Sequence, residues 1–130
     1  MGEPVQRILL VEDDRFLRKA AEATLRRNGF VVRTAVDGEE ALQRIQEEAP
    51  DLVLLDLIMP KLQGFEVLRI LKQDPATRQI PVVVLSNLGQ EGDVQQALQG
   101  GAIAYLIKAN LSLQDLVTHV QKILQGGTHA

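Results

Sequence analysis

Charged or hydroxyl side chains follow four of the apolar runs in this sequence, at the point where each run stops. These residues are Glu12 and Asp13, Asp56, Ser86, and Lys108. Short apolar runs bounded by turn residues are typical of strands that are buried on both faces. Because the carboxyl ends of parallel strands lie at one edge of a sheet, we expect these side chains to lie close together.

The types of these residues point to phosphoryl chemistry beside a metal ion. Three carboxylates held close together repel one another, and one of them would be protonated unless a cation joined them. Oxygen ligands suit Mg²⁺, which uses one or two carboxylates and keeps positions for water and a phosphate oxygen. Lys108 supplies a point charge suited to phosphate, and Ser86 supplies a hydroxyl donor. The set indicates a phosphoryl group beside Mg²⁺, with Asp56 as the carboxylate nucleophile.

Taken alone, each of these residues has an ordinary structural explanation. An acidic pair before a helix often stabilises the helix N-terminus, and an Asp after a strand often forms a turn. We assign Asp14 to the start of the first helix, and Pro60 and Gly64 to the shape of the loop after Asp56. It is the combination of residues, in register with the strand ends, that predicts a site.

Five apolar runs alternate with five amphipathic segments, which predicts a parallel sheet covered by helices on both faces. Residues 30–35 are more polar than the other runs, as expected for a strand at the edge of the sheet. The fold class is therefore α/β and doubly wound. The predicted strands are residues 7–11, 30–35, 51–55, 81–85 and 103–107. The predicted helices are residues 14–28, 37–48, 64–73, 90–99 and 112–124.

The composition bounds the class of protein. The chain has 130 residues, a hydrophobic fraction of 45% and a net charge of −3, so we expect no binding to nucleic acid. The absence of cysteine excludes disulfides and sulfur-ligated metals. No apolar run approaches the roughly 18 residues that span a bilayer. The N-terminus does not resemble a signal peptide, so we expect a cytoplasmic protein without a membrane partner. We predict a single domain over residues 1–130, with a core at about 7–124 and flexible tails at 1–5 and 126–130.

Four motifs occur in a specific order and spacing, namely LLVEDD, DLIMPKLQG, VVVLS and YLIK. With these motifs the chain resembles the receiver domain of response regulators, over about residues 7–124. The resemblance implies a flavodoxin-like (βα)5 fold with a five-stranded parallel sheet of order 2-1-3-4-5. It implies that Asp13 and Asp56 ligate Mg²⁺ directly, together with the backbone carbonyl of Ile58, and that Glu12 acts through water.

The same resemblance implies a function for the remaining residues. Asp56 would be the phosphoacceptor, Lys108 would contact the phosphoryl oxygens, and Ser86 would hydrogen-bond the phosphoryl group. Tyr105 would be the aromatic switch whose rotamer follows Ser86. The protein would be a stand-alone switch of a two-component system that takes its phosphoryl group from a histidine kinase or a phosphotransfer protein. It would signal by protein contact or phosphorelay to a target that the sequence does not name, with no DNA-binding domain. It would be no enzyme beyond its own phosphoryl transfer and slow autodephosphorylation.

Three alternative functions are open to a fold of this kind. A haloacid-dehalogenase-like phosphatase would need a second Asp where this chain has Ile58. A flavin-binding protein would need a Ser-, Thr- or Gly-rich loop after the first strand, where this chain has Glu-Asp-Asp. The nearer alternative is a receiver-like interaction module that is not phosphorylated.

The sequence departs from the family pattern at several positions near the site. Ala109 stands where the family usually has Pro, so we predict a trans peptide bond before it, because a cis bond there costs about 2.5–4 kcal/mol. Asn87 is larger than the usual Ala and could narrow access to the site. Ile58 and Leu88 are apolar and predict slow autodephosphorylation. Residues 101–104 lack the acidic side chains of many receivers that dimerise, so we predict a monomer.

Overall fold

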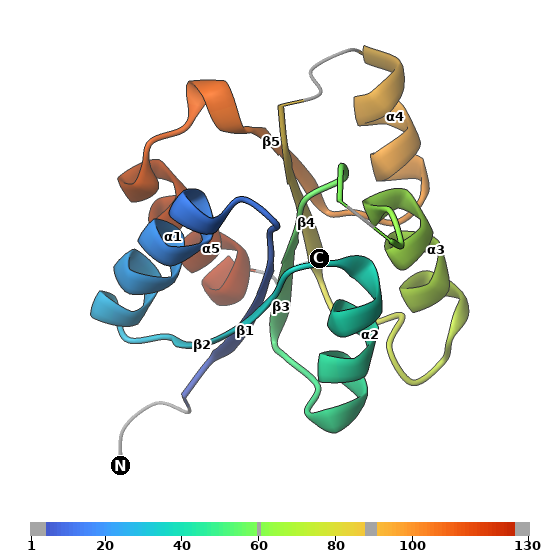
Figure 1. Ribbon diagram of the computed structural model, residues 1–130, viewed down its shortest axis with the longest axis horizontal. Helices are drawn as coiled ribbons and strands as arrows, with labels where there is room; N and C mark the ends of the chain where they lie inside the picture. The colour runs from blue at the N-terminus through green and yellow to red at the C-terminus, as the bar shows by residue number, and fades with distance from the viewer. Residues whose placement is uncertain (1–4, 60, 88–90, 127–130) are drawn as a thin grey trace.

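The computed structural model describes residues 5–59, 61–87 and 91–126, in which five strands alternate with five α-helices (Figure 1). A short 3-10 helix, η1 (Lys108–Asn110), follows the last strand. The strands are β1 (Arg7–Val11), β2 (Val31–Ala35), β3 (Leu52–Leu55), β4 (Val82–Ser86) and β5 (Ala104–Ile107). The α-helices are α1 (Arg15–Arg27), α2 (Gly38–Glu47), α3 (Gly64–Gln73), α4 (Glu91–Gln99) and α5 (Leu113–Gly126).

The strands form one parallel sheet in the order β2-β1-β3-β4-β5. Strand β1 pairs with both β2 and β3, which places Leu9 opposite Arg33 on one side and Val53 on the other. Strand β4 pairs with β3 and β5, so β2 and β5 form the edges of the sheet. The predicted fold class and strand order are confirmed, as is the edge position of the more polar second strand. All carboxyl ends of the strands lie at one edge of the sheet, as the site requires.

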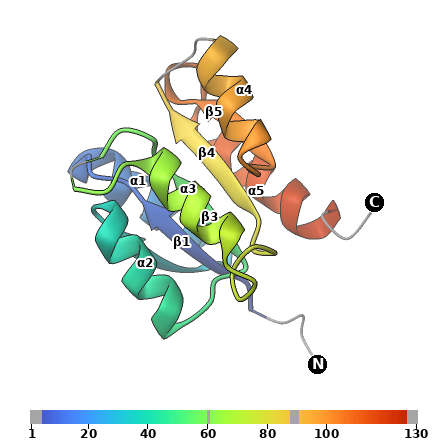
Figure 2. The same ribbon diagram turned by 90° about the vertical axis from the view of Figure 1, so that its right-hand side faces the viewer.

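Helices cover both faces of the sheet (Figures 1 and 2), with α1 and α5 on one face and α2, α3 and α4 on the other. Alternate side chains of β1 enter the two cores. Leu9 and Val11 pack with residues of α2 and α3, whereas Ile8 and Leu10 pack with residues of α1 and α5. Burial on both faces explains why the central strands read as continuous apolar runs.

Two helices begin at capping side chains. Asp37 Oδ1 accepts a hydrogen bond from Glu40 N at 2.8 Å at the start of α2. Before α5, Ser112 Oγ accepts from Asp115 N at 3.0 Å, and Asp115 Oδ2 accepts from Ser112 N at 3.1 Å. This reciprocal pair satisfies two backbone donors that have no partner within the helix. Such caps fix where each helix starts and therefore how long the loops at the carboxyl edge are.

A few boundaries differ from the predictions or cannot be compared with them. Helix α5 ends at Gly126 rather than at residue 124, a shift of the size expected where a helix frays. The η1 helix was not predicted, because three residues carry no periodic pattern. The peptide bonds between described residues are all trans, including the one before Ala109, as predicted. Pro60, Leu88 and the ends of the predicted tails, at 1–4 and 127–130, lie outside the described residues.

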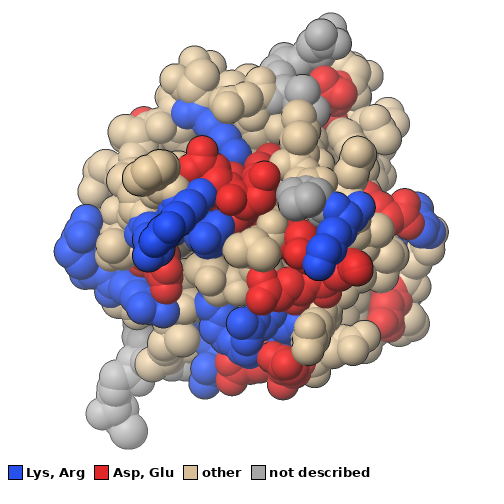
Figure 3. All heavy atoms as spheres, viewed as in Figure 1, with Lys and Arg blue, Asp and Glu red and all other residues tan. Residues whose placement is uncertain are grey.

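The surface charges are mixed in sign. Figure 3 shows acidic and basic side chains interspersed across one face of the molecule. Arg7 pairs with Glu48 at 3.1 Å and Arg33 pairs with Glu47 at 2.8 Å, which joins β1 and β2 to the end of α2. Exposed pairs of this kind contribute roughly 0–1 kcal/mol each. Among the described helices, none combines the length and the apolar character that crossing a membrane requires.

Candidate functional site

Three carboxylates meet at the carboxyl edge of the sheet. Glu12 and Asp13 follow β1, and Asp56 follows β3. The backbone of Asp56 donates to Val11 O at 3.1 Å, which continues the pairing of the two strands by one residue. One oxygen from each of the three side chains lies within 4.8 Å of the others. Glu12 and Asp56 are buried, at 1% and 5% exposure, whereas Asp13 is exposed. The predicted convergence of these residues is therefore present in the structure.

Lys108 reaches the two buried carboxylates from the end of β5, where it is the first residue of η1. Its Nζ lies 2.7 Å from Glu12 Oε1 and 3.0 Å from Asp56 Oδ2. The contact to Asp56 is a hydrogen bond, whereas the contact to Glu12 is an ion pair without hydrogen-bond alignment. Burial alone would lower the pKa of Lys108, but the contacts with Glu12 and Asp56 outweigh it and raise that pKa above its usual value. Lys108 is therefore held as a cation.

One ammonium group does not balance three carboxylates. Burial raises the pKa of Glu12 above its usual value and the Asp56 charge raises it further, although contacts with Lys108 and the Asp14 backbone lower it in part. The native chain is thus short of positive charge at this point. All the side-chain donors are carboxylate oxygens, one of them exposed, which is the donor set that a hard divalent cation such as Mg²⁺ prefers. The residues fit the cation predicted from the sequence.

The loop after β3 orients the Asp56 carboxylate. Ile58 N donates to Asp56 Oδ1 at 3.2 Å, while Lys108 contacts Oδ2. Gly64, at the start of α3, packs directly beneath this loop and donates to Leu57 O at 3.0 Å. A Cβ at Gly64 would lie 2.3 Å from the Asp56 carbonyl oxygen and 2.6 Å from Leu57 Cα. The assignment of Gly64 to the shape of this loop is therefore confirmed, because a larger residue would displace the backbone of Asp56.

The loop after β1 is held by residues of α1. Asp14 caps this helix, as predicted, and its Oδ1 accepts from Leu17 N at 3.0 Å. Arg18 was not predicted to take part. Its Nη1 donates to the carbonyl oxygens of Glu12, at 2.9 Å, and Asp13, at 3.3 Å. The signal in the sequence was the spacing, since Arg18 lies four residues after Asp14 and so on the same face of the helix.

Ser86 lies on β4, which pairs with β3, and Tyr105 lies on β5, which pairs with β4. Ser86 is the last residue of β4 and is 1% exposed, and Tyr105 lies half-buried on β5. A hydrogen bond joins their side chains. Burial raises the pKa of Tyr105, and the charges of Asp93 in α4 and of Asp56 raise it further. Tyr105 is therefore close enough to Ser86 and to Asp93 of α4 to interact with both.

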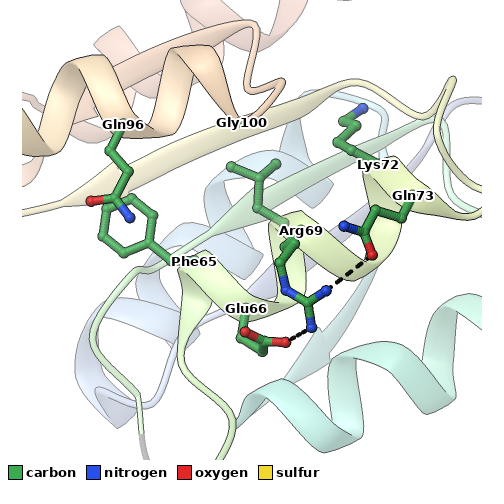
Figure 4. Close-up of a pocket in the computed structure, with 8 residues that line it drawn as sticks. Phe65, Glu66, Arg69, Lys72, Gln73, Gln96 and Gly100 are labelled. Carbon is green, nitrogen blue, oxygen red and sulfur yellow. Dashed lines mark hydrogen bonds and ion pairs between the residues drawn. The ribbon is translucent and has the colours of Figure 1, made fainter.

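Two large hollows among the described residues lie away from the carboxylates. One of about 410 Å³ lies between α3 and α4, where Arg69 is placed between Glu66 and Gln73, and Phe65 faces Gln96 (Figure 4). By contrast, the cleft that Lys108 helps to line measures only about 30 Å³.

Comparison with known proteins places the chain among signalling proteins. The family model of the response regulator receiver domain matches residues 8–121. The gliding motility regulatory protein of Myxococcus xanthus is 40% identical over 117 residues, which make up 90% of this chain and 15% of that protein. The chain spans about half or less of the length of the curated relatives that it matches here.

Two solved structures of the same kind superpose closely. The phosphorylated cyanobacterial phytochrome response regulator RcpA gives a TM-score of 0.84 at 34% identity, with 96% of this chain and 97% of that chain covered. The Mn²⁺-bound form of response regulator Rcp1 gives a TM-score of 0.80 at 33% identity, with 96% of each chain covered.

Proposed function

Because the chain belongs to the response regulator receiver family, we propose that it is a phosphorylation-dependent switch of a two-component system, with Asp56 as the phosphoacceptor. Receiver domains of this family are signalling modules that receive phosphoryl groups from histidine kinases. The observation that carries the proposal is the position of Asp56, a buried carboxylate within reach of Glu12, Asp13 and the ammonium group of Lys108.

The transfer reaction follows from these contacts. A carboxylate oxygen of Asp56 forms a bond to the phosphorus of a phosphohistidine in a kinase or phosphotransfer protein. The phosphorus–nitrogen bond breaks, and its electron pair returns to the imidazole of the donor. Lys108, which contacts Asp56 Oδ2 before the reaction, stays beside the acceptor and neutralises the charge that arrives with the phosphoryl oxygens.

Three side chains of the proposed site would hold a divalent cation. Asp13 and Asp56 would be direct ligands with the backbone carbonyl of Ile58, and Glu12 would act through water. Mg²⁺ bound there would supply charge neutralisation for the phosphoryl oxygens. The chain itself orients Asp56 through Ile58 N and Lys108, and Arg18 holds the backbone of the loop that carries Asp13.

The response would begin at Ser86 and pass to Tyr105. The phosphoryl group would compete with Tyr105 for the Ser86 hydroxyl, because the two side chains share a hydrogen bond before phosphorylation. Tyr105 would then adopt the rotamer that the new arrangement of Ser86 favours. Helix α4 would change its position in response. Phosphorylation shifts this equilibrium only by the difference in its interactions with the two states. Output would pass by protein contact or by phosphorelay.

Intact mass after incubation with acetyl phosphate and Mg²⁺ tests the proposal. The wild-type chain should gain one phosphoryl group, and Asp56→Asn should gain none. Asp74→Asn is a matched control, since it removes an exposed carboxylate outside the site and should leave the gain unchanged. A wild-type chain that gains no mass would instead support the alternative, a receiver-like interaction module that is not phosphorylated.

The phosphorylated form would be long-lived. Ile58 is 58% exposed beside Asp56, and its apolar side chain cannot hydrogen-bond an attacking water. Ile58→Gln would supply a polar group at this position and should speed the loss of the phosphoryl group from Asp56. Rapid loss from the wild-type protein would contradict this part of the proposal. The monomeric state stays a prediction, which light scattering before and after phosphorylation would test.

A further inference from the structure

Arg18 makes an unusual pair of contacts for a helix surface residue. It is the fourth residue of α1, and its guanidinium turns back toward the loop that connects β1 to the helix. Nη1 donates to Glu12 O at 2.9 Å and to Asp13 O at 3.3 Å. A hydrogen bond from a charged donor is stronger than one between neutral groups. One side chain therefore holds two consecutive peptide units of the loop.

Those two peptide units set the direction in which the Asp13 side chain leaves the loop. Glu12 has further supports, because its Oε2 accepts from Asp14 N at 3.1 Å and its Oε1 lies 2.7 Å from Lys108 Nζ. Asp13, in contrast, is exposed, and Arg18 holds it by the carbonyl oxygen. This leaves the Asp13 carboxylate oxygens to a cation. The exposed ligand is thus held through its backbone.

The charge of Arg18 and its hydrogen bonds have opposite effects on the affinity of the site for Mg²⁺. A guanidinium near a cation site repels the cation, so removal of the charge alone would strengthen Mg²⁺ binding. Removal of the hydrogen bonds would release the loop and weaken binding. The two effects differ in sign, which makes the role of Arg18 measurable.

We propose that Arg18 is a positioning residue for the metal ligand Asp13, and that it raises Mg²⁺ affinity by fixing the carbonyl groups of Glu12 and Asp13. The inference rests on the proposed function, since it takes the three carboxylates as the metal site. Loss of residues that orient metal ligands typically reduces metal affinity by about 10- to 100-fold. Arg18 supports the ligand through the backbone, so we expect a value near the lower end, about tenfold.

The test is a titration of the full chain with Mg²⁺ alone, followed by backbone amide shifts in NMR spectra. Arg18→Met should raise the dissociation constant about tenfold. Arg18→Lys, which keeps a charged donor of shorter reach, should recover part of the affinity. Arg15→Met removes a charge from the exposed first residue of the same helix and should leave the affinity unchanged or slightly higher. Should Arg18→Met fail to fold, Arg18→Leu, which likewise carries no hydrogen-bond donor, takes its place with the same expectation.

A second readout separates positioning from general stability. In acetyl phosphate assays, saturating Mg²⁺ should restore the rate of Asp56 phosphorylation in Arg18→Met to near that of the wild type. Unchanged or tighter Mg²⁺ binding in Arg18→Met would overturn the inference while the proposed function stands. A lost rate that Mg²⁺ does not restore would also overturn it. A wild-type chain that binds no Mg²⁺ would overturn the metal site itself, and this inference with it.

Discussion

The carboxylate edge, formed by Glu12, Asp13 and Asp56, differs from helix α4 in how deeply its residues are buried. Glu12 and Asp56 follow β1 and β3, two of the three interior strands, whose residues are almost all buried between two layers of helices. Helix α4 buries only Ala97 among its described residues, whereas α3 buries Gly64 and three apolar side chains. Elements with little buried apolar surface open or move at the lowest free energy. The proposed phosphoryl chemistry is therefore placed at the more deeply buried part of the fold, and the proposed response at the less buried part.

Ser86 and Tyr105 connect these two regions. Ser86 belongs to the buried end of β4. Its hydrogen bond reaches Tyr105, whose pKa is also raised by the charge of Asp93 in α4. If the comparison is right, substitutions at the carboxylate edge should change the stability of the whole fold. Substitutions at Tyr105 or in α4 should have smaller and more local effects.

The largest loss of stability is expected from Lys108→Met. Glu12 and Asp56 would remain buried without the cation that they share, which should lower the free energy of unfolding by about 3 kcal/mol. Urea unfolding in EDTA at neutral pH measures this loss, and added Mg²⁺ should recover part of it. Lys122→Met on the exposed side of α5 is the control, with an expected change within about 0.5 kcal/mol. Equal losses of unfolding free energy in the two variants would contradict the idea that Lys108 stabilises the fold through Glu12 and Asp56.

The second-largest loss of stability is expected from Gly64→Ala. The added Cβ would lie 2.3 Å from the backbone oxygen of Asp56, and a backbone atom has no rotamer by which to move away. Crowding of this kind in a packed region typically costs about 2 kcal/mol. The same urea experiment measures it, and the rate of phosphorylation by acetyl phosphate should fall as Asp56 shifts. A variant with native stability and native rate would show that this loop yields more easily than its packing indicates.

Protonation of Glu12 should make stability depend on pH. Its pKa is raised in the native chain, so the native state holds a proton more tightly than the unfolded state. This contribution is present below the unfolded pKa and is lost as the pH rises through the native pKa. In EDTA, the free energy of unfolding should therefore increase when the pH is lowered from neutral toward the ordinary range of a glutamate. Glu12→Gln should lack this dependence, and parallel curves for the two proteins would refute it.

The hydrogen bond between Tyr105 and Ser86 should contribute less, about 1 kcal/mol. Tyr105→Phe, Ser86→Ala and the double variant form a cycle from which the coupling energy is obtained. Tyr105→Phe should still accept a phosphoryl group on Asp56, because the tyrosine lies outside the acceptor site. Strictly additive effects on the free energy of unfolding would mean that the two side chains are not coupled in solution.

The residues of the site and the layers of the fold could largely be predicted from the sequence, for a physical reason. Buried parallel strands must be apolar throughout, so a charged residue that ends such a run marks the carboxyl edge. Glu12, Asp56 and Lys108 were found in this way, and the structure brings them together. The alternation of apolar runs and amphipathic segments likewise predicted the layers and the parallel sheet.

The contacts that the sequence did not predict depend on where individual side chains and backbone groups point, and hydrophobic periodicity does not encode this. Arg18 looks like any charged residue on a helix surface until the loop beside it is folded. The support of Asp56 by Ile58 N comes from the backbone, where side-chain identity gives no signal. Weak anchoring of α4 could be suspected from its glutamine-rich face, but how few residues it buries depends on how the helix lies on the sheet.

Gly92→Ala should have the smallest effect, and one of opposite sign to that of Gly64→Ala. Gly92 lies in α4 with no atom within 4 Å of an added Cβ, so the alanine meets open space. Alanine restricts the unfolded chain and favours the helix, which should raise the free energy of unfolding by about 0.5 kcal/mol. Amide hydrogen exchange should slow in α4 and stay unchanged in β1 and β3. If exchange in α4 is already as slow as in the central strands of the wild type, the helix is not the loosely held region, and the contrast with the carboxylate edge fails.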